Sequence, residues 1–218
     1  MSATELGPED YRFVECPNST CLLRFPGVPG VACPLCASPC VWVADRCLPA
    51  PRSEGRAARP LELLLDNVRS VFNVGSIFRS SDGAGVQGLY LCGITPTPAH
   101  KAMDKTALGA QARVRWTHHA NARRLASDLL EAGKTLWALE HCKASVDLFD
   151  AAEPRPEELV LVLGNEVTGV DPGVLELCSL TLHIPMRGAK NSLNVATAMG
   201  VAAYALTAPE TGETGPTS

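Results

Sequence analysis

The chain of 218 residues is long enough for one catalytic domain and a small additional module. Its 46% hydrophobic and 19% charged content is typical of a soluble globular protein, and its longest apolar runs fall far short of the roughly 20 residues that span a bilayer. Because the first residues also lack the apolar core of a secretory signal, we expect a cytoplasmic protein without a membrane partner.

The net charge of −4 argues against a nucleic-acid partner, but the charge is unevenly distributed. Residues 52–124 carry eleven basic and five acidic side chains, whereas residues 125–218 carry five basic and thirteen acidic ones. A local basic face can bind a phosphate backbone although the whole chain is acidic. On charge alone, an RNA-binding face and an ordinary solvated face are equally good interpretations of the middle segment.

The N-terminal fifty residues hold six of the nine cysteines. Cys16 and Cys21 are followed by Cys33 and Cys36 in the pattern C-x4-C…C-x2-C, which suits tetrahedral zinc bound by four thiolates. So short a segment cannot build a sufficient core, and metal binding would supply its folding energy. We therefore predict a zinc-ribbon-like module over residues 1–48 with a structural zinc ion. Cys40 could replace one ligand, and a group of reduced structural cysteines is the alternative.

Two segments are predicted to lack regular structure. Residues 49–60 are rich in Pro, Ala, Arg and Gly without apolar periodicity, as expected of a linker. Residues 207–218 are polar and contain Pro and Gly, as expected of a disordered tail. The domain between them would cover residues 61–206.

Strands and helices alternate along this domain, which predicts an α/β fold with a mostly parallel sheet. Short apolar runs predict strands, and apolar residues at helical spacing between Ser, Asn, Asp and Gly caps predict helices. We expect Asn73 to cap the first helix and Ser192 the last. The expected strands are 61–65, 89–92, 114–116, 135–139, 159–163 and 180–184, and the expected helices are 74–84, 122–132, one that follows Asp171, and one that follows Ser192.

The G-x-G-x-x-G pattern of residues 83–88 does not indicate a dinucleotide site. That fingerprint must follow a strand and open a helix so that the phosphate meets the helix N-terminus. Here it follows a predicted helix and opens a predicted strand, so we interpret it as a helix-ending turn. The chain also lacks the Walker A pattern that nucleotide hydrolysis would require.

Three other segments each join a predicted strand to a helix and are rich in polar side chains and glycine. They are residues 67–79, 163–170 and 184–195. In open α/β sheets ligands bind at the carboxyl ends of strands, and glycine there lets the backbone approach a ligand closely. In order and spacing the three segments resemble the three motifs of the SpoU (TrmH-type) family of RNA 2′-O-ribose methyltransferases, within the SPOUT superfamily. The matching patterns are N-x-G-x-I-x-R at residues 73–79, G-N-E-x-x-G at 164–169, and I-P-M-x-G-x-x-x-S-L-N-V at 184–195.

The resemblance implies an α/β fold whose C-terminal part forms a deep trefoil knot, and a homodimer whose active site is completed across the interface. It also implies that the knot loops hold S-adenosylmethionine, largely through backbone groups. The cofactor contacts carried over from the motifs are Gly164, Ile184 and Leu193, with Met186 and Ser192 nearby. Leu139, at the end of the strand expected at 135–139, is a weaker candidate.

Four polar residues carry the expected catalytic chemistry: Arg79, Asn73, Glu166 and Asn194. Arginine is a poor base at neutral pH, so we expect Arg79 to bind the phosphate of the target and orient its 2′-hydroxyl. Asn73 would hold Arg79 or the ribose. Glu166 could act as a base or cap the chain that follows it, and we favour the structural role.

The resemblance leaves the RNA open between tRNA and rRNA, and base methylation remains possible in place of ribose methylation. A non-catalytic RNA-binding protein on the same fold is the first alternative. A zinc-dependent adaptor with a small-molecule pocket and no RNA partner is the second. Retention of all four polar residues favours the enzyme.

Overall fold

The computed structural model describes residues 10–47, 58–151 and 155–209 and divides the chain into two compact units, Met1–Glu54 and Gly55–Ser218. Most of the predicted linker and of the predicted tail lies outside the described residues. Thr207, predicted to begin the tail, is the last residue of a helix and is buried. Within the described parts, no helix is long and apolar enough to span a bilayer.

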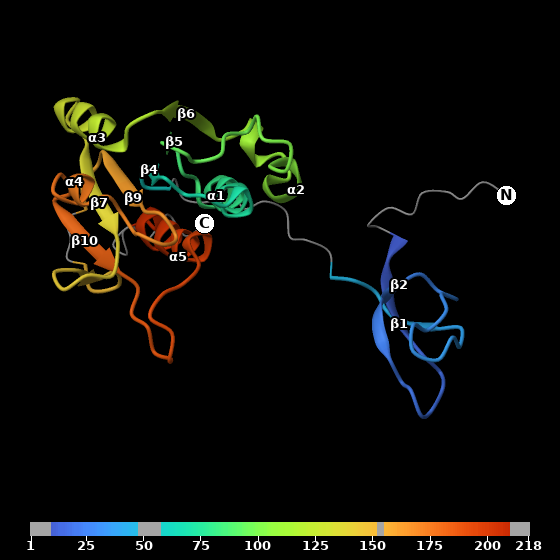
Figure 1. Ribbon diagram of the computed structural model, residues 1–218. Coiled ribbons are helices and arrows are strands. Elements are labelled where there is room, and N and C mark those ends of the chain that lie inside the picture. The colour runs from blue at the N-terminus through green and yellow to red at the C-terminus, as the bar shows by residue number, and fades with distance from the viewer. Residues whose placement is uncertain (1–9, 48–57, 152–154, 210–218) are drawn as a thin grey trace, which may run out of the picture. The chain divides into compact units, whose positions relative to one another are not determined.

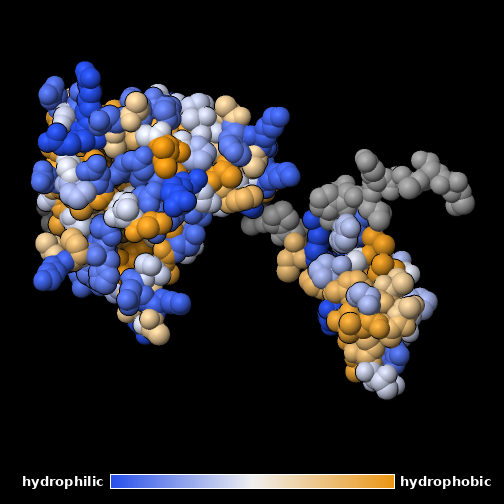
Figure 2. Space-filling model, viewed as in Figure 1, coloured by the Kyte–Doolittle hydropathy of each residue, from blue (hydrophilic) through white to orange (hydrophobic). Residues whose placement is uncertain are grey.

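The first unit contains a three-stranded antiparallel sheet in the order β2-β1-β3. Its first two strands are labelled in Figure 1. Its strands are β1 (Arg12–Glu15), β2 (Arg24–Gly27) and β3 (Val41–Ala44). The buried centre is small and consists of Val14 packed with Cys16, Cys33 and Cys40. Apolar side chains cover much of the face of this unit that is visible in Figure 2. So small a core does not hold a sheet without a further link between the strands.

The second unit is built on a seven-stranded sheet in which every strand pairing is parallel, in the order β6-β5-β4-β9-β7-β10-β8. The central strands are continuous apolar runs, as expected where helices cover both faces of a sheet. The strands are β4 (Leu61–Asp66), β5 (Gly88–Cys92), β6 (Arg115–His119), β7 (Thr135–Leu139), β8 (Val146–Asp147), β9 (Leu159–Leu163) and β10 (Leu180–His183).

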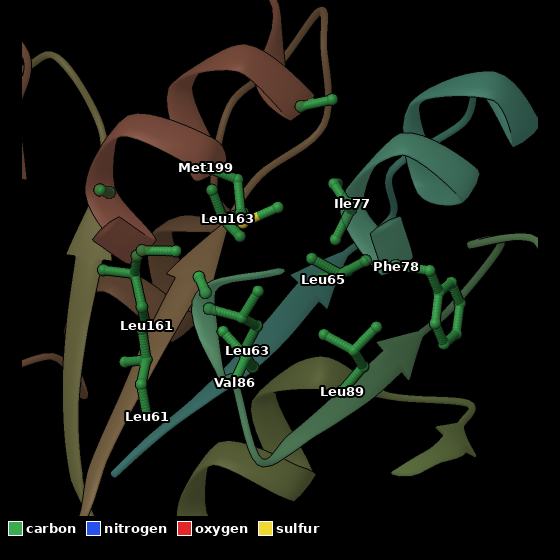
Figure 3. Packing of buried hydrophobic residues seen from close by; sticks show 14 of the residues in the cluster. Leu61, Leu63, Leu65, Ile77, Phe78, Val86, Leu89, Leu161, Leu163 and Met199 are labelled. Atoms are coloured by element: carbon green, nitrogen blue, oxygen red, sulfur yellow. The ribbon is translucent and has the colours of Figure 1, made fainter. Parts of the chain in front are cut away.

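Helices cover both faces of this sheet. Side by side on one face lie α1 (Val71–Ala84) and α5 (Val195–Thr207). Their Ile77 and Met199 point toward the leucines of β4 and β9, and Phe78 lies on the side of Leu89 in β5 (Figure 3). The other face is covered by α3 (Ala122–Glu131) and α4 (Pro172–Leu175). The short α2 (Asp104–Ala107) and the single-turn η2 (Ala110–Ala112) lie between β5 and β6. The expected α/β fold with a parallel sheet is therefore confirmed.

Both expected helix caps are wrong by two or three residues. The hydroxyl of Ser70, not Asn73, caps α1 by accepting a hydrogen bond from the Asn73 backbone N–H, so Asn73 lies within the first turn. The side chain of Asn194, not Ser192, caps α5 by accepting from the backbone N–H groups of Ala196 and Thr197. The strand expected at 114–116 is β6, which begins one residue later and extends to His119.

Candidate active site

A cavity of about 530 Å³ opens at the carboxyl ends of β7, β9 and β10. Its walls come from the turn after β9, the residues that follow β7, and the long connection from β10 to α5, which projects from the sheet in Figure 1. All six residues predicted to bind the cofactor line this cavity: Leu139, Gly164, Ile184, Met186, Ser192 and Leu193. Segments separated by up to 54 positions in the chain thus meet at one cavity because parallel strands place their carboxyl ends at the same edge.

Three of the four predicted catalytic residues meet at the rim of the cavity. The Asn73 side-chain amide donates to Glu166 Oε1 over 2.9 Å, and Asn194 Nδ2 donates to Asn73 Oδ1 over 3.0 Å. Glu166 and Asn194 line the cavity directly. We call Asn73, Glu166 and Asn194 the polar cluster. Each amide has a fixed orientation in this chain of bonds, because Asn73 must donate to the carboxylate and accept from Asn194.

The polar cluster lies where two neighbouring strands send their connections to opposite faces of the sheet. The connection from β4 enters α1 on one face, whereas the connection from β9 enters α4 on the other. Such a switch in direction leaves a crevice between the carboxyl ends of the two strands, which is where ligands bind in open α/β sheets.

Glu166 supports the segment that leads into α1. Its carboxylate accepts hydrogen bonds from the backbone N–H groups of Arg69 at 2.9 Å and Ser70 at 3.1 Å, besides that from Asn73. Partial burial alone would raise the pKa of Glu166, but these donors outweigh it and lower the pKa below its ordinary value. Glu166 is therefore a weak base that caps the start of α1, rather than the chain that follows it.

Arg79 is not brought into the polar cluster. It lies six residues beyond Asn73 on α1, about 9 Å further along the helix axis, and its side chain is exposed. It does not line the cavity, and among the described residues it makes no ion pair. One chain therefore presents the cavity and the polar cluster together, with Arg79 outside them.

Gly164 packs against the turn after β9 too closely for any side chain. A Cβ atom at this position would lie 2.2 Å from both the Gly169 carbonyl carbon and the Val170 nitrogen. Gly169 has φ of 73° and faces the Glu140 carboxylate, so a side chain is disfavoured there as well. The two glycines expose backbone groups to the cavity.

Glu140, His141 and His183 also line the cavity and were not predicted as site residues. The Glu140 carboxylate accepts from the backbone N–H groups of His141 and Val170, both at 3.0 Å. The rings of His141 and His183 lie 5.4 Å apart. The only signal in the sequence that His141 belongs to a site is its position just after the carboxyl end of a buried strand.

The four predicted zinc ligands form a separate cluster in the first unit. The sulfur atoms of Cys16, Cys21, Cys33 and Cys36 all lie within 4.8 Å of one another. The closest pairs are Cys16 with Cys36 at 3.3 Å and Cys21 with Cys33 at 3.6 Å. Cys40 is buried beside the cluster but is not one of the four.

Curated relatives of similar sequence carry the names of rRNA or tRNA methyltransferases. The 23S rRNA (guanosine-2'-O-)-methyltransferase RlmB of Vibrio vulnificus (strain CMCP6) is 32% identical over 148 residues, which make up 67% of this chain and 58% of that protein. The chain thus matches under two thirds of the length of that relative. The "Putative TrmH family tRNA/rRNA methyltransferase YacO" of Bacillus subtilis (strain 168) is 29% identical and covers 70% of this chain and 60% of its own length.

The solved structures agree. The AdoMet-bound rRNA methyltransferase from Sinorhizobium meliloti has a TM-score of 0.61 and 25% identity, covering 68% of this chain and 56% of its own. A family model described as the SpoU rRNA Methylase family matches residues 60–204, well over half of the sequence. The chain therefore belongs to the SpoU rRNA Methylase family.

Proposed function

We propose that this protein is an S-adenosylmethionine-dependent RNA methyltransferase that acts on a ribose 2′-hydroxyl of tRNA or rRNA. One observation carries the proposal. All six expected cofactor residues line a single cavity, and the polar cluster lies at the rim of that cavity. Membership of the SpoU family and the names of the relatives support the reaction class.

The cavity fits the cofactor in size and chemistry. Its volume of about 530 Å³ falls within the range of small-molecule sites. Its lining combines the apolar side chains of Leu139, Ile184 and Leu193 with the backbone of Gly164. The missing Cβ at Gly164 keeps the backbone of the turn close to the cavity. When bound, S-adenosylmethionine would supply an electrophilic methyl group on its sulfonium. The chain would bind the RNA and orient the hydroxyl, whose proton would be lost late to the target's phosphate or to water.

Asn73 and Asn194 are proposed to hold the ribose, and Glu166 to fix Asn73. The lowered pKa of Glu166 and its three hydrogen-bond donors make it a positioning residue rather than the base. Arg79 would bind the target's phosphate through its planar guanidinium and orient the 2′-hydroxyl.

We propose that a second copy of the chain completes the site. Exposed apolar side chains lie on the two neighbouring helices, with Phe72 on α1 and Val201 and Tyr204 on α5. Arg79 lies outside the cavity of its own chain, which is consistent with its delivery to the cavity of a partner. A deep trefoil knot in the connection from β10 to α5 remains a prediction, supported by the return of α5 across the sheet to α1.

The cysteine cluster is proposed to hold a structural zinc ion. Four thiols within 4.8 Å suit tetrahedral coordination once deprotonated, and the small core around Val14 leaves the module dependent on such a link. No His or carboxylate joins the cluster among the described residues, which favours a structural over a catalytic ion.

The reaction is tested by transfer of labelled methyl from S-adenosylmethionine to total cellular RNA, followed by nuclease digestion and mass analysis of nucleosides. We expect a 2′-O-methyl nucleoside from the wild type, none from Arg79→Ala and a greatly reduced amount from Arg79→Lys, because lysine lacks the fork geometry. Arg115→Ala, which removes an exposed arginine at the start of β6, serves as the matched control. Full rate in Arg79→Lys would exclude the proposed role of Arg79, and a methylated base would exclude the ribose as acceptor.

A further inference from the structure

A chain of asparagine hydrogen bonds joins the loops after β9, β4 and β5. Asn165 Oδ1 accepts from the Val167 N–H at 2.9 Å, and Asn165 Nδ2 donates to the Asn67 carbonyl at 2.7 Å. Asn67 Oδ1 then accepts from the Ile94 N–H at 3.1 Å. The backbones of Val167 and Ile94, 73 positions apart in the chain, are thereby fixed to a common support.

Further contacts hold this support at Asn67. Asn67 has φ of 56°, a conformation that costs energy for a residue with a side chain, and its amide also donates to the buried Asp66 carboxylate at 2.8 Å. Gly93, beside Ile94, lies so close to the Asn67 side chain that a Cβ atom would be 2.1 Å from Oδ1. Three loops therefore hold one arrangement, with Asn67 at their centre.

The two supported residues are aliphatic and exposed, and Val167 also belongs to the lining of the cavity. Val167 is 75% exposed and Ile94 is 67% exposed, the largest exposed fractions among the large hydrophobic residues of the second unit. Loop ends of this kind are ordinarily polar. Here hydrogen bonds fix the backbones of the two residues, so their exposed aliphatic side chains are available to a partner at this edge of the sheet.

Basic side chains accompany these two residues. Arg69 is exposed, and its backbone N–H donates to the Glu166 carboxylate. Arg123 and Arg124 follow the carboxyl end of β6 at the start of α3 and are also exposed. The strands are parallel, so all these residues lie at the carboxyl edge of the sheet. None of the three arginines makes an ion pair within the described ranges. The acidic Glu166 and Asp171 lie nearby, but both accept hydrogen bonds from backbone N–H groups.

We propose that the carboxyl edge over β4, β5 and β6 binds the RNA strand that flanks the target nucleotide. Ile94 and Val167 contact base faces, and Arg69, Arg123 and Arg124 contact phosphates. We call these five residues the edge surface. The inference rests on the proposed function, because the edge surface adjoins the proposed site. Glu166 accepts hydrogen bonds from the backbone of Arg69 and Ser70 and from the Asn73 side chain at the rim of the cavity. A strand bound here would lead its next nucleotide to the polar cluster.

The binding test uses the full-length protein and a fluorescein-labelled single-stranded RNA of 20 nucleotides with mixed sequence, measured by anisotropy at several salt concentrations. Arg69→Ala and Arg123→Ala are each expected to weaken binding and to reduce the salt slope by about 0.7, the value for one phosphate contact on a single strand. The double variant Ile94→Ala/Val167→Ala is expected to weaken binding roughly tenfold without changing the slope.

Matched controls lie at the opposite, amino edge of the sheet. Arg115→Ala removes an exposed arginine at the start of β6, and Leu130→Ala removes a partly exposed leucine near the end of α3. Both should bind the RNA like the wild type. Equal losses in the controls and the edge variants, or no loss in the edge variants, would overturn the edge surface and favour a protein partner or a second copy at these residues.

A methyl-transfer assay on the same variants separates this inference from the proposed function. Arg69→Ala and Arg123→Ala, at residues outside the cavity lining, should need more RNA for half-maximal rate while S-adenosylmethionine affinity, measured by calorimetry, is unchanged. A wild type that shows the predicted RNA-binding pattern but transfers no methyl would refute the enzyme and leave the edge surface standing. Normal transfer with unchanged RNA requirement in every edge variant would refute the edge surface alone.

Discussion

Asn194 Nδ2 donates a hydrogen bond of 3.0 Å to Asn73 Oδ1 across a sequence separation of 121 residues. The same Asn194 side chain caps α5 through its oxygen, which accepts from the backbone N–H groups of Ala196 and Thr197. One side chain thus fixes the start of α5 and orients Asn73 on α1. The stability of the last helix and the geometry of the polar cluster are therefore coupled at Asn194.

Substitution of Asn194 should separate the two roles. Asn194→Asp replaces the amide oxygen with a carboxylate oxygen that can also cap α5, so the melting temperature of the variant should stay near that of the wild type. The same variant cannot donate to Asn73, and methyl transfer should fall roughly tenfold or more. Asn194→Ala should lose activity and also about 1 kcal/mol of unfolding free energy. Normal activity in Asn194→Asp would contradict the role of the Asn73 contact.

The Glu166 carboxylate should contribute a pH-dependent part of the stability. A carboxyl whose pKa is lower in the folded than in the unfolded state stabilises the fold above its unfolded value, which is about 4.3 for Glu. This contribution is lost as the pH falls through the folded pKa. The difference in unfolding free energy between wild type and Glu166→Gln should therefore be constant above about pH 5.5 and shrink below about pH 4.3. Urea titrations across pH 3–7 measure it, and a constant difference over that range would contradict the role of the three donors.

Gly164 and Gly188 form a matched pair for testing the cavity. Gly164→Ala would place a methyl group 2.2 Å from the backbone of Gly169 and Val170, so the turn must shift, at a cost of about 3 kcal/mol. We expect loss of S-adenosylmethionine binding by calorimetry. Gly188 lies in the loop after β10 with no atom near the added methyl position, and Gly188→Ala should bind normally. Equal affinity in the two variants would show that the Gly164 contact does not shape the site.

The strands of the second unit were predictable because burial on both faces of a parallel sheet selects continuous apolar runs. The expected bounds of β7 and β9 match the structure residue for residue. The polar edge strand β6 was predicted one residue early and three residues too short, because Arg115 and His118 on an exposed edge carry no apolar pattern. The two-residue strand β8 was not predicted, because only its pairing with β10 identifies it as a strand.

The helix starts and part of the site depend on contacts that no local window contains. Ser70 caps α1 beside a carboxylate 96 positions away, and Asn194 caps α5 while bonded to Asn73. The cofactor residues were predicted from the family motifs rather than from physical pattern. His141 and His183 were missed because only the adjacency of β7 and β10 in the sheet brings them together.

The cysteine cluster predicts one zinc ion per chain. Metal analysis of the purified protein should find about one equivalent, and Cys33→Ala should lose it together with the fold of the first unit, since binding energy is folding energy here. Cys47→Ala, outside the cluster, is the matched control and should retain the metal. Cys40→Ala should also retain it, although loss of a buried side chain lowers stability. Retention of zinc in Cys33→Ala would contradict the ligand set, and loss of zinc in Cys40→Ala would add Cys40 to it.

Ala37 offers a test of strain beside the same cluster. It directly follows Cys36 and has φ of 61°, in the left-handed region where an alanine is disfavoured by roughly 1–2 kcal/mol and glycine is not. Ala37→Gly should therefore stabilise the zinc-bound module by about 1 kcal/mol, after allowance for the greater freedom of glycine in the unfolded chain. Competition with a chromophoric chelator should show tighter zinc binding in the variant. A matched Ala44→Gly change, in strand β3, should instead weaken the module, because glycine loses more conformational freedom in a strand than alanine does. Weaker zinc binding in Ala37→Gly would show that the positive φ of Ala37 does not destabilise the zinc-bound module.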